Sequence, residues 1–115
     1  IPWHEEAKKL EFPYAELGTI GLETAFGLTN QLLHEQITLE QLIPLFGHNA
    51  RSIFGIKQPK IEVGKTANLT IFQPNKSWIF QEIDIQSKSQ NTPLVGKKLR
   101  GKVVGIFNNG QYQSI

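Results

Sequence analysis

The chain contains neither cysteine nor methionine among its 115 residues. The lack of cysteine excludes disulfides, thiolate nucleophiles and Cys-ligated metals, and it fits a cytoplasmic protein. No apolar run reaches the roughly 18 residues that a membrane-spanning helix needs, so we expect no membrane partner. Charge of one sign is also scarce, because the formal net charge is only +2. One local basic cluster (Lys97, Lys98, Arg100 and Lys102) lacks interleaved aromatic residues, so we expect a solvated strand face and no nucleic-acid binding.

A complete catalytic pattern is missing as well. His4, His34 and His48 lie far apart and match no metal-ligand spacing. We interpret His34 and His48 as helix-end or loop residues, whereas His4 keeps a site role as an alternative. No serine stands in a nucleophile-elbow context, and Asp84 is expected at a strand or loop edge. Because the sequence also begins at Ile1 without any methionine, we expect a piece of a longer protein.

The most distinctive feature that is present is the loop Gly18-Thr-Ile-Gly21-Leu-Glu-Thr24. Apolar residues recur after it with a period near 3.6, which predicts an amphipathic helix over residues 21–35. A loop that leads onto a helix N-terminus presents backbone N–H groups and a partial positive charge. The loop therefore suits an anion or a carboxylate.

The rest of the sequence divides into a helical half and a β-rich half. A capping box at Thr38 and Gln41 predicts the start of a second helix, and a third helix over residues 49–54 would end at Gly55. The dipeptide Asn109-Gly110 predicts a tight hairpin. We expect an α+β fold, with helices to about residue 55 and then an antiparallel sheet. The expected strands are residues 61–63, 69–72, 78–80, 103–107 and 112–115, with Pro74-Asn75-Lys76 among the breaks between them.

Several segments carry a more specific signal when they are taken in order. The first runs from Pro2-x-x-x-Glu6-x-Lys8 to Gly18-x-x-Gly21-Leu-Glu-Thr24, the second is Gly64-Lys-x-Ala67-Asn-Leu-Thr-Ile-Phe72-x-Pro74, and the third is Ser87-Lys-Ser-x-Asn91-Thr-Pro93-Leu-x-Gly96. A closing hairpin follows over residues 101–110. Together they resemble the bacterial dihydroorotases of the cyclic amidohydrolase superfamily, in the region that follows the last catalytic aspartate.

This resemblance implies that the chain is the C-terminal fragment of a zinc amidohydrolase. Residues 1–55 would be the last loop and helices of a (β/α)₈ barrel, and residues 56–115 the C-terminal part of a composite β-sandwich. The parent enzyme would interconvert N-carbamoyl-L-aspartate and dihydroorotate in pyrimidine biosynthesis. The zinc ligands and the proton-shuttling aspartate would lie upstream of Ile1, so we expect the fragment to bind no metal and to be inactive alone.

The resemblance also implies where the small-molecule substrate would be bound. Leu17 and Gly18 occupy positions that contact substrate through backbone groups. Trp3 occupies the position of a histidine that contacts substrate, and its indole offers only one neutral donor in place of a charged imidazole. His4, one residue further on, is the alternative for that role.

The tryptophan leaves a second hypothesis open. The parent would then be a non-catalytic dihydroorotase homologue that acts as a scaffold for aspartate transcarbamoylase. A cyclic amidohydrolase of the allantoinase or dihydropyrimidinase type and an independent β-rich binding module with a helical cap are further alternatives. Whichever holds, helices that pack against a barrel would expose apolar side chains in the isolated chain, so we expect self-association. Those side chains include Leu22, Phe26, Leu42 and Phe46.

Overall fold

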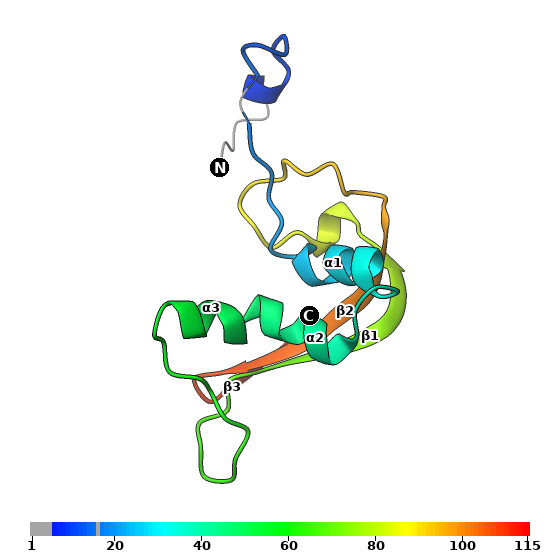
Figure 1. Ribbon diagram of the computed structural model, residues 1–115. Coiled ribbons are helices and arrows are strands. Elements are labelled where there is room, and N and C mark those ends of the chain that lie inside the picture. Colours follow the sequence, from blue (N-terminus) through cyan, green and yellow to red (C-terminus); the bar gives the residue numbers. More distant parts are fainter. Residues whose placement is uncertain (1–5, 16) are drawn as a thin grey trace.

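Three short helices and a three-stranded antiparallel sheet form the fold of the computed structural model, which describes residues 6–15 and 17–115 (Figure 1). This arrangement confirms a small α+β architecture. No helix in the described ranges is both long enough and apolar enough to cross a membrane. The helices are α1 (Ala25–Leu33), α2 (Leu39–Phe46) and α3 (His48–Ile53), the strands are β1 (Leu69–Ile79), β2 (Lys98–Asn108) and β3 (Gln111–Ser114), and two 3₁₀ turns are η1 (Glu6–Lys8) and η2 (Glu82–Asp84).

The helices follow the sequence pattern, but α1 is shorter than predicted. It begins at Ala25 and not at residue 21, because residues 22–24 form a turn in which the Thr24 N–H donates to the Gly21 carbonyl at 3.3 Å. The capping box before α2 is present, since the Thr38 N–H donates to Gln41 Oε1 at 2.9 Å. The third helix ends before Gly55, whose φ is +64°, as predicted.

The sheet has the strand order β1-β2-β3, with both pairs antiparallel. Asn109 and Gly110 join β2 to β3 with φ angles of +49° and +75°, which confirms the predicted hairpin turn. The predicted strands 69–72 and 78–80 are parts of one strand. Pro74-Asn75-Lys76 forms a bulge inside it, between the pairs Gln73–Lys102 and Ser77–Arg100. A bulge accommodates proline because no ladder hydrogen bond is required there.

The predicted strand over residues 61–63 is wrong. These residues lie in the irregular connection between α3 and β1 that projects at the bottom of Figure 1. The side chains of Ile61 and Val63 are exposed. Three β-rich residues do not make a strand without a neighbouring strand to accept their backbone hydrogen bonds, and the described part of the chain provides none here.

The helix α1 packs closely on β2 because two glycines face each other. A Cβ on Gly27 would lie 3.1 Å from the Gly101 carbonyl, and a Cβ on Gly101 would lie 2.6 Å from the Phe26 ring. Buried Asn30 then joins the helix to both strands, because its Nδ2 donates to the carbonyls of Pro74 at 2.8 Å and Arg100 at 3.0 Å. The bulge in β1 is therefore tied to α1.

The apolar core is small for the length of the chain. Leu42 is buried, which corrects the expectation that it is exposed: α2 folds back on α1, and the Phe26 and Phe46 rings lie 6.0 Å apart. Leu22 and Phe46 are exposed at 88% and 46%, as expected, but Phe26 is half-buried because its ring packs 4.7 Å from that of Phe72. The radius of gyration is 16.7 Å, compared with about 13 Å for a compact domain near this length. Among the described residues the buried hydrophobic side chains are Ile20, Leu42, Phe80 and Leu99.

Candidate functional site

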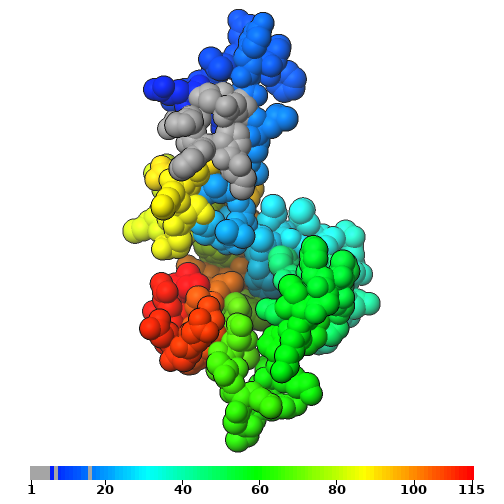
Figure 2. Space-filling model, turned by 90° about the vertical axis from the view of Figure 1, so that its left-hand side faces the viewer, coloured from blue at the N-terminus to red at the C-terminus, as the bar shows by residue number. Residues whose placement is uncertain are grey.

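The glycine-bounded loop and the Ser87–Gly96 motif region, far apart in the sequence, lie side by side in the structure. In Figure 2 the segment 82–91 (yellow) lies beside residues 18–24 (blue). Asn91 makes three of the hydrogen bonds between them. Its backbone carbonyl accepts hydrogen bonds from Thr19 Oγ1 at 2.8 Å and from the Ile20 N–H at 3.2 Å, while its Nδ2 donates to the Gly18 carbonyl at 3.3 Å.

Glu23 forms a second connection between the same two segments. Its Oε1 accepts hydrogen bonds from the Ser87 hydroxyl at 2.6 Å, the Ser87 N–H at 2.7 Å and the Gln86 N–H at 3.1 Å. Burial alone would raise the pKa of the Glu23 carboxyl, but these hydrogen bonds together outweigh it and hold the pKa below its ordinary value. Glu23 is therefore ionised when it holds the loop.

The position of Asn91 is itself set by a tight turn. The Thr92 N–H donates to the Gln90 carbonyl at 2.9 Å, which makes Asn91 the central residue of the turn. The Thr92 hydroxyl then accepts the Leu94 N–H at 3.2 Å, and Pro93 disfavours a helical conformation for Thr92. The Asn-Thr-Pro part of the motif therefore presents Asn91 to the loop.

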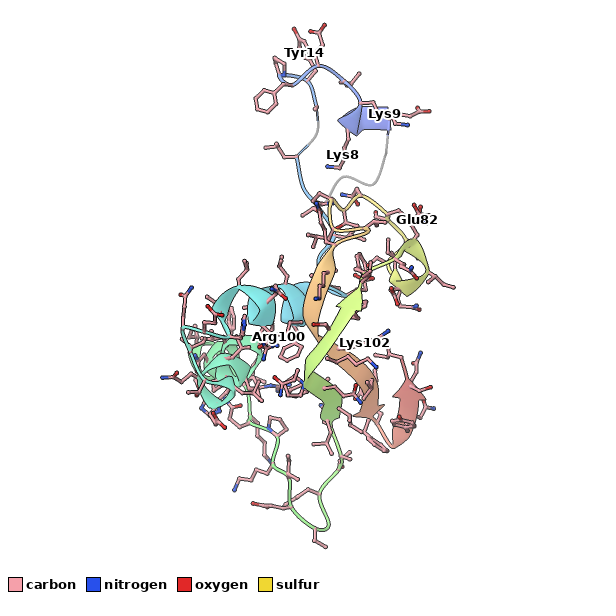
Figure 3. The ribbon with its side chains drawn as sticks, turned by 90° about the vertical axis from the view of Figure 1, so that its right-hand side faces the viewer. Lys8, Lys9, Tyr14, Glu82, Arg100 and Lys102 are labelled. Atoms are coloured by element: carbon pink, nitrogen blue, oxygen red, sulfur yellow. The ribbon has the colours of Figure 1, made fainter. Side chains whose placement is uncertain are left out.

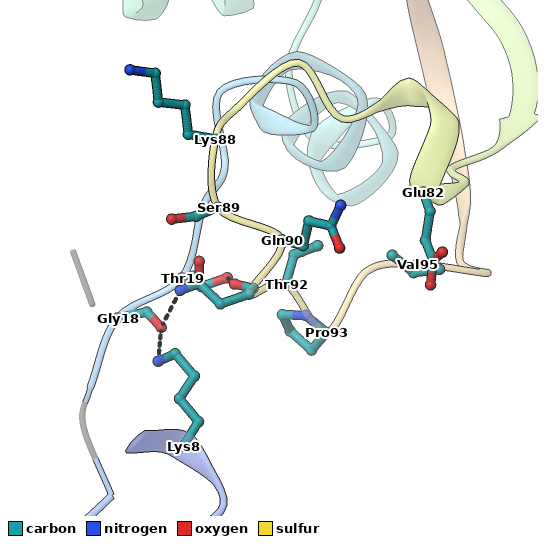
Figure 4. Close-up of a pocket in the computed structure, with 11 residues that line it drawn as sticks. Lys8, Gly18, Thr19, Glu82, Lys88, Ser89, Gln90, Thr92, Pro93 and Val95 are labelled. Atoms are coloured by element: carbon teal, nitrogen blue, oxygen red, sulfur yellow. Dashed lines mark hydrogen bonds between the residues drawn. The ribbon is translucent and has the colours of Figure 1, made fainter. Parts of the chain in front are cut away.

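A pocket of about 760 Å³ lies between these two segments and η1 (Figure 4). The Lys8 side chain extends from η1 towards the rest of the fold and its Nζ donates to the Gly18 carbonyl (Figures 3 and 4). Lysine, glutamate and amide side chains line the pocket together with apolar Pro93 and Val95, so both signs of charge border a partly apolar surface. Its lining residues are Lys8, Gly18, Thr19, Glu82, Lys88, Ser89, Gln90, Asn91, Thr92, Pro93 and Val95.

The Gly18 carbonyl therefore accepts hydrogen bonds from both Lys8 and Asn91. Gly18 has a φ of +111°, a conformation that side-chain-bearing residues rarely adopt. Leu17, the other residue predicted to contact substrate, is 84% exposed. Leu17 directly precedes the loop, and Gly18 is its first residue.

The remaining candidates are placed as follows. Trp3 and His4 lie outside the described residues. His34 is the C-cap residue of α1 and His48 begins α3, so neither lines the pocket, which agrees with their interpretation as helix-end residues. Asp84 ends η2, where its carboxylate accepts the Gln81 N–H at 2.9 Å. The described residues contain no group of three or more His, Cys, Asp or Glu side chains that could hold a metal ion.

The basic cluster on β2 is less solvated than predicted. Lys97 and Lys98 are exposed, but Lys102 Nζ lies 4.8 Å from the centre of the Trp78 ring and 3.8 Å from Asp84 Oδ1. Arg100 donates to Asn75 Oδ1 at 2.9 Å, on the bulge of β1. Lys102 and Arg100 therefore make contacts with residues of β1 and η2. The spacing of basic residues in the sequence does not predict these contacts.

Sequence reasoning did not single out Lys8, Glu23, Ser87 or Asn91 as site residues. Each occurs in a motif that supports the resemblance to dihydroorotases, but no role in the site was assigned to it. The missing information was that two motifs more than 60 positions apart pair with each other, as the contacts of Glu23 and Asn91 show. Glu23, Ser87 and Asn91 are polar motif residues outside every helix and strand, and this was the signal that could have found them; Lys8 ends η1.

Comparison with known proteins gives a consistent result. The chain is 42% identical over 112 residues to the dihydroorotase of Chlorobaculum tepidum, a match that spans 96% of this chain and 26% of that protein. It is 39% identical over 109 residues to the dihydroorotase of Aquifex aeolicus, which spans 94% and 26%. The dihydroorotase of Caldicellulosiruptor saccharolyticus is 37% identical over 112 residues. No family model matches.

The chain spans about a quarter of the length of these curated relatives. Within that length the matches run through nearly all of the chain, so they include both the Gly18–Thr24 loop and the Asn91 turn. The chain belongs to the dihydroorotase family.

Proposed function

We propose that this chain is the C-terminal part of a dihydroorotase that interconverts N-carbamoyl-L-aspartate and dihydroorotate. The observation that carries the proposal is the similarity to several dihydroorotases over 94–96% of the chain. The pairing of the two motifs around the loop supports it, because it holds together the residues that the resemblance assigns to the substrate side of the site. Residues 1–55 would complete a barrel and residues 56–115 a β-sandwich, as the resemblance implies.

The small core supports the proposal that the chain is part of a larger fold. Large apolar side chains are exposed on all three helices and on β1, among them Leu32, Ile53 and Ile79, and in the connections, among them Leu22 and Phe54. A soluble domain of this size ordinarily buries such residues together, since exposed apolar surface is costly when it is contiguous. An upstream barrel would provide the surface that covers them.

Within this proposal the chain contributes to substrate binding. The loop would present backbone groups at Leu17 and Gly18 to the substrate, with the Gly18 peptide held by Lys8 and Asn91. The resemblance assigns zinc, which would polarise the reacting carbonyl, to ligands upstream of Ile1. The described residues do not fit a zinc site by themselves, so we assign no step to a metal on them.

The proposal is tested with the purified full-length parent protein and with the 115-residue chain. We expect the parent to form dihydroorotate from N-carbamoyl-L-aspartate and to catalyse the reverse reaction, and the isolated chain to do neither. A parent without turnover in either direction, when loaded with zinc, would contradict the proposed activity. Turnover by the isolated chain would contradict the assignment of the catalytic groups to the upstream part.

A second candidate follows from Trp3, which stands where the family has a histidine. A scaffold homologue would have no turnover but would bind aspartate transcarbamoylase. The variant Trp3→His in the parent separates the two, because it restores a charged donor only if the rest of the site is intact. Activity that appears only in this variant would favour the scaffold function for the natural sequence.

A further inference from the structure

We infer that Asn91 is a positioning residue for substrate binding, because it bonds three consecutive residues of the loop, at the Gly18 carbonyl, the Thr19 hydroxyl and the Ile20 N–H. The inference rests on the proposed function, since it assigns the loop to the substrate. It goes beyond that function because it gives a task to the tail segment that follows the sheet strand β1. Asn91 touches no reacting atom in this scheme and acts only through the loop.

Among the described residues, Asn91 alone makes the three hydrogen bonds that join the tail segment to Gly18, Thr19 and Ile20. Asn91 bonds Gly18 through its side chain and Thr19 and Ile20 through its backbone carbonyl, with distances of 3.3, 2.8 and 3.2 Å. The side-chain bond determines the direction of the Gly18 carbonyl. Because a peptide unit is planar, that direction also sets the orientation of the Thr19 N–H. Gly18 and Thr19 both line the pocket.

The loop needs such an external constraint because its key residue is glycine. Gly18 has a φ of +111° and no side chain of its own to pack, so its backbone is intrinsically free to adopt many conformations. Ordering a flexible loop at the moment of binding weakens affinity, and ordering it beforehand removes that cost. Asn91 and Lys8 provide this order from opposite ends of the chain.

The chemistry of the amide also fixes its orientation. The Asn91 Oδ1 is buried and has no hydrogen-bond partner in the described part of the chain. Exchanging the oxygen and nitrogen would place Oδ1 against the Gly18 carbonyl, so that two acceptors would face each other. The donor must therefore point at Gly18, and Asn91→Asp converts an attraction into a repulsion without changing the size of the side chain.

The experiment measures steady-state kinetics of the zinc-loaded parent with Asn91→Ala, Asn91→Asp and Lys8→Met. We expect KM for N-carbamoyl-L-aspartate to rise about 5-fold to 10-fold in Asn91→Ala and more than about 10-fold in Asn91→Asp, with kcat within about 2-fold of wild type. The rise in KM with little change in kcat is the pattern for a group that orders a binding loop. Lys8→Met, at the second donor of the same carbonyl, should raise KM in the same way.

Asn49→Ala and Lys57→Met are the matched controls, because both residues are exposed and lie away from the pocket. Hydrogen exchange of the Thr19 and Ile20 amides gives a second readout that does not depend on activity, and it should become faster in Asn91→Ala. An active parent whose Asn91 and Lys8 variants keep the wild-type KM overturns the inference. Unchanged exchange in Asn91→Ala overturns it as well. An inactive wild-type parent overturns the proposed function, and the exchange data then decide separately whether Asn91 orders the loop.

Discussion

At the scale of single residues, Glu23 carries the strongest connection between the loop and the tail. Three donors converge on one of its oxygens, at 2.6, 2.7 and 3.1 Å. Hydrogen bonds to a charged acceptor are worth about 1.5 to 3 kcal/mol each in favourable cases, although a half-exposed group gains less. The ionised carboxylate is thus a structural component of the loop. Its neutral form accepts these bonds more weakly.

The ionisation of Glu23 predicts a pH dependence of stability. Because hydrogen bonding lowers its folded-state pKa below the ordinary 4.5, the contribution of this carboxylate is complete above pH 4.5 and is lost as the pH falls through the folded-state pKa. We expect Glu23→Gln to lower the free energy of unfolding by about 1 to 2 kcal/mol at pH 7. The difference from wild type should shrink below pH 4.5. Urea unfolding at several pH values, followed by tryptophan fluorescence, measures both effects.

Glu11→Gln is the control for this experiment, since Glu11 is exposed and remote from the loop contacts. It should leave the urea midpoint unchanged at every pH. If Glu23→Gln and wild type instead differ by the same amount at pH 3 and pH 7, the carboxylate is not responsible for the effect.

At the scale of elements, the crossing of α1 over β2 depends on the absence of a side chain at Gly101. Its φ is +95°, and an added Cβ would lie 2.6 Å from Phe26 Cε1 and 2.9 Å from Asn30 Nδ2. Backbone strain and steric overlap therefore act together at this position. The helix would have to move away from the sheet, and the hydrogen bonds from Asn30 to both strands would lengthen.

We expect Gly101→Ala to destabilise the fold by about 2 to 4 kcal/mol, as the sum of backbone strain and overpacking. Gly21→Ala is the matched control: Gly21 does not have a left-handed φ, and nothing lies within 4 Å of an added Cβ. That variant should change stability by less than about 0.5 kcal/mol. Equal midpoints for the two variants in urea unfolding would contradict the proposed packing.

Sequence patterns predicted the elements better than the contacts between them. The capping box at Thr38 and the turn at Asn109-Gly110 involve only residues that are close in the sequence. The residue types alone therefore predict both structures. The bulge at Pro74 could not be predicted in this way, because it depends on Asn30 of α1. The burial of Leu42 likewise depends on how α2 folds back. The candidate site shows the same division: Gly18 was predicted, but its partner Asn91 was found only in the structure.

At the scale of the whole molecule, the exposed apolar surface is the dominant property. It extends over the helices and over the connection to β1, where Phe46, Ile53, Phe54 and Ile61 are all exposed. The radius of gyration of 16.7 Å reflects the same loose arrangement. The residues near η1 stand apart from the sheet, with Tyr14 at the far end (Figure 3). Such a surface needs a covering partner, and in the proposed parent this is the upstream barrel.

This surface leads to a prediction for the isolated chain. We expect it to form dimers or larger oligomers, because burying apolar area at about 25 cal/mol per Å² favours association. Light scattering across a range of concentrations measures the mass. The double variant Ile53→Glu, Phe54→Glu should shift the equilibrium towards monomer, whereas Lys57→Glu, a nearby exposed residue, should have little effect.

Co-expression with the upstream part of the parent tests whether the apolar surface that drives oligomerisation is the surface that packs against the barrel. If the exposed helices belong against the barrel, the upstream part should bind the chain in a one-to-one complex and suppress the oligomers, since both compete for the same apolar side chains. The double variant at Ile53 and Phe54 should then weaken the complex as well as the oligomer. A chain that remains monomeric alone, or that keeps its oligomers in the presence of the upstream part, would contradict this account of the surface.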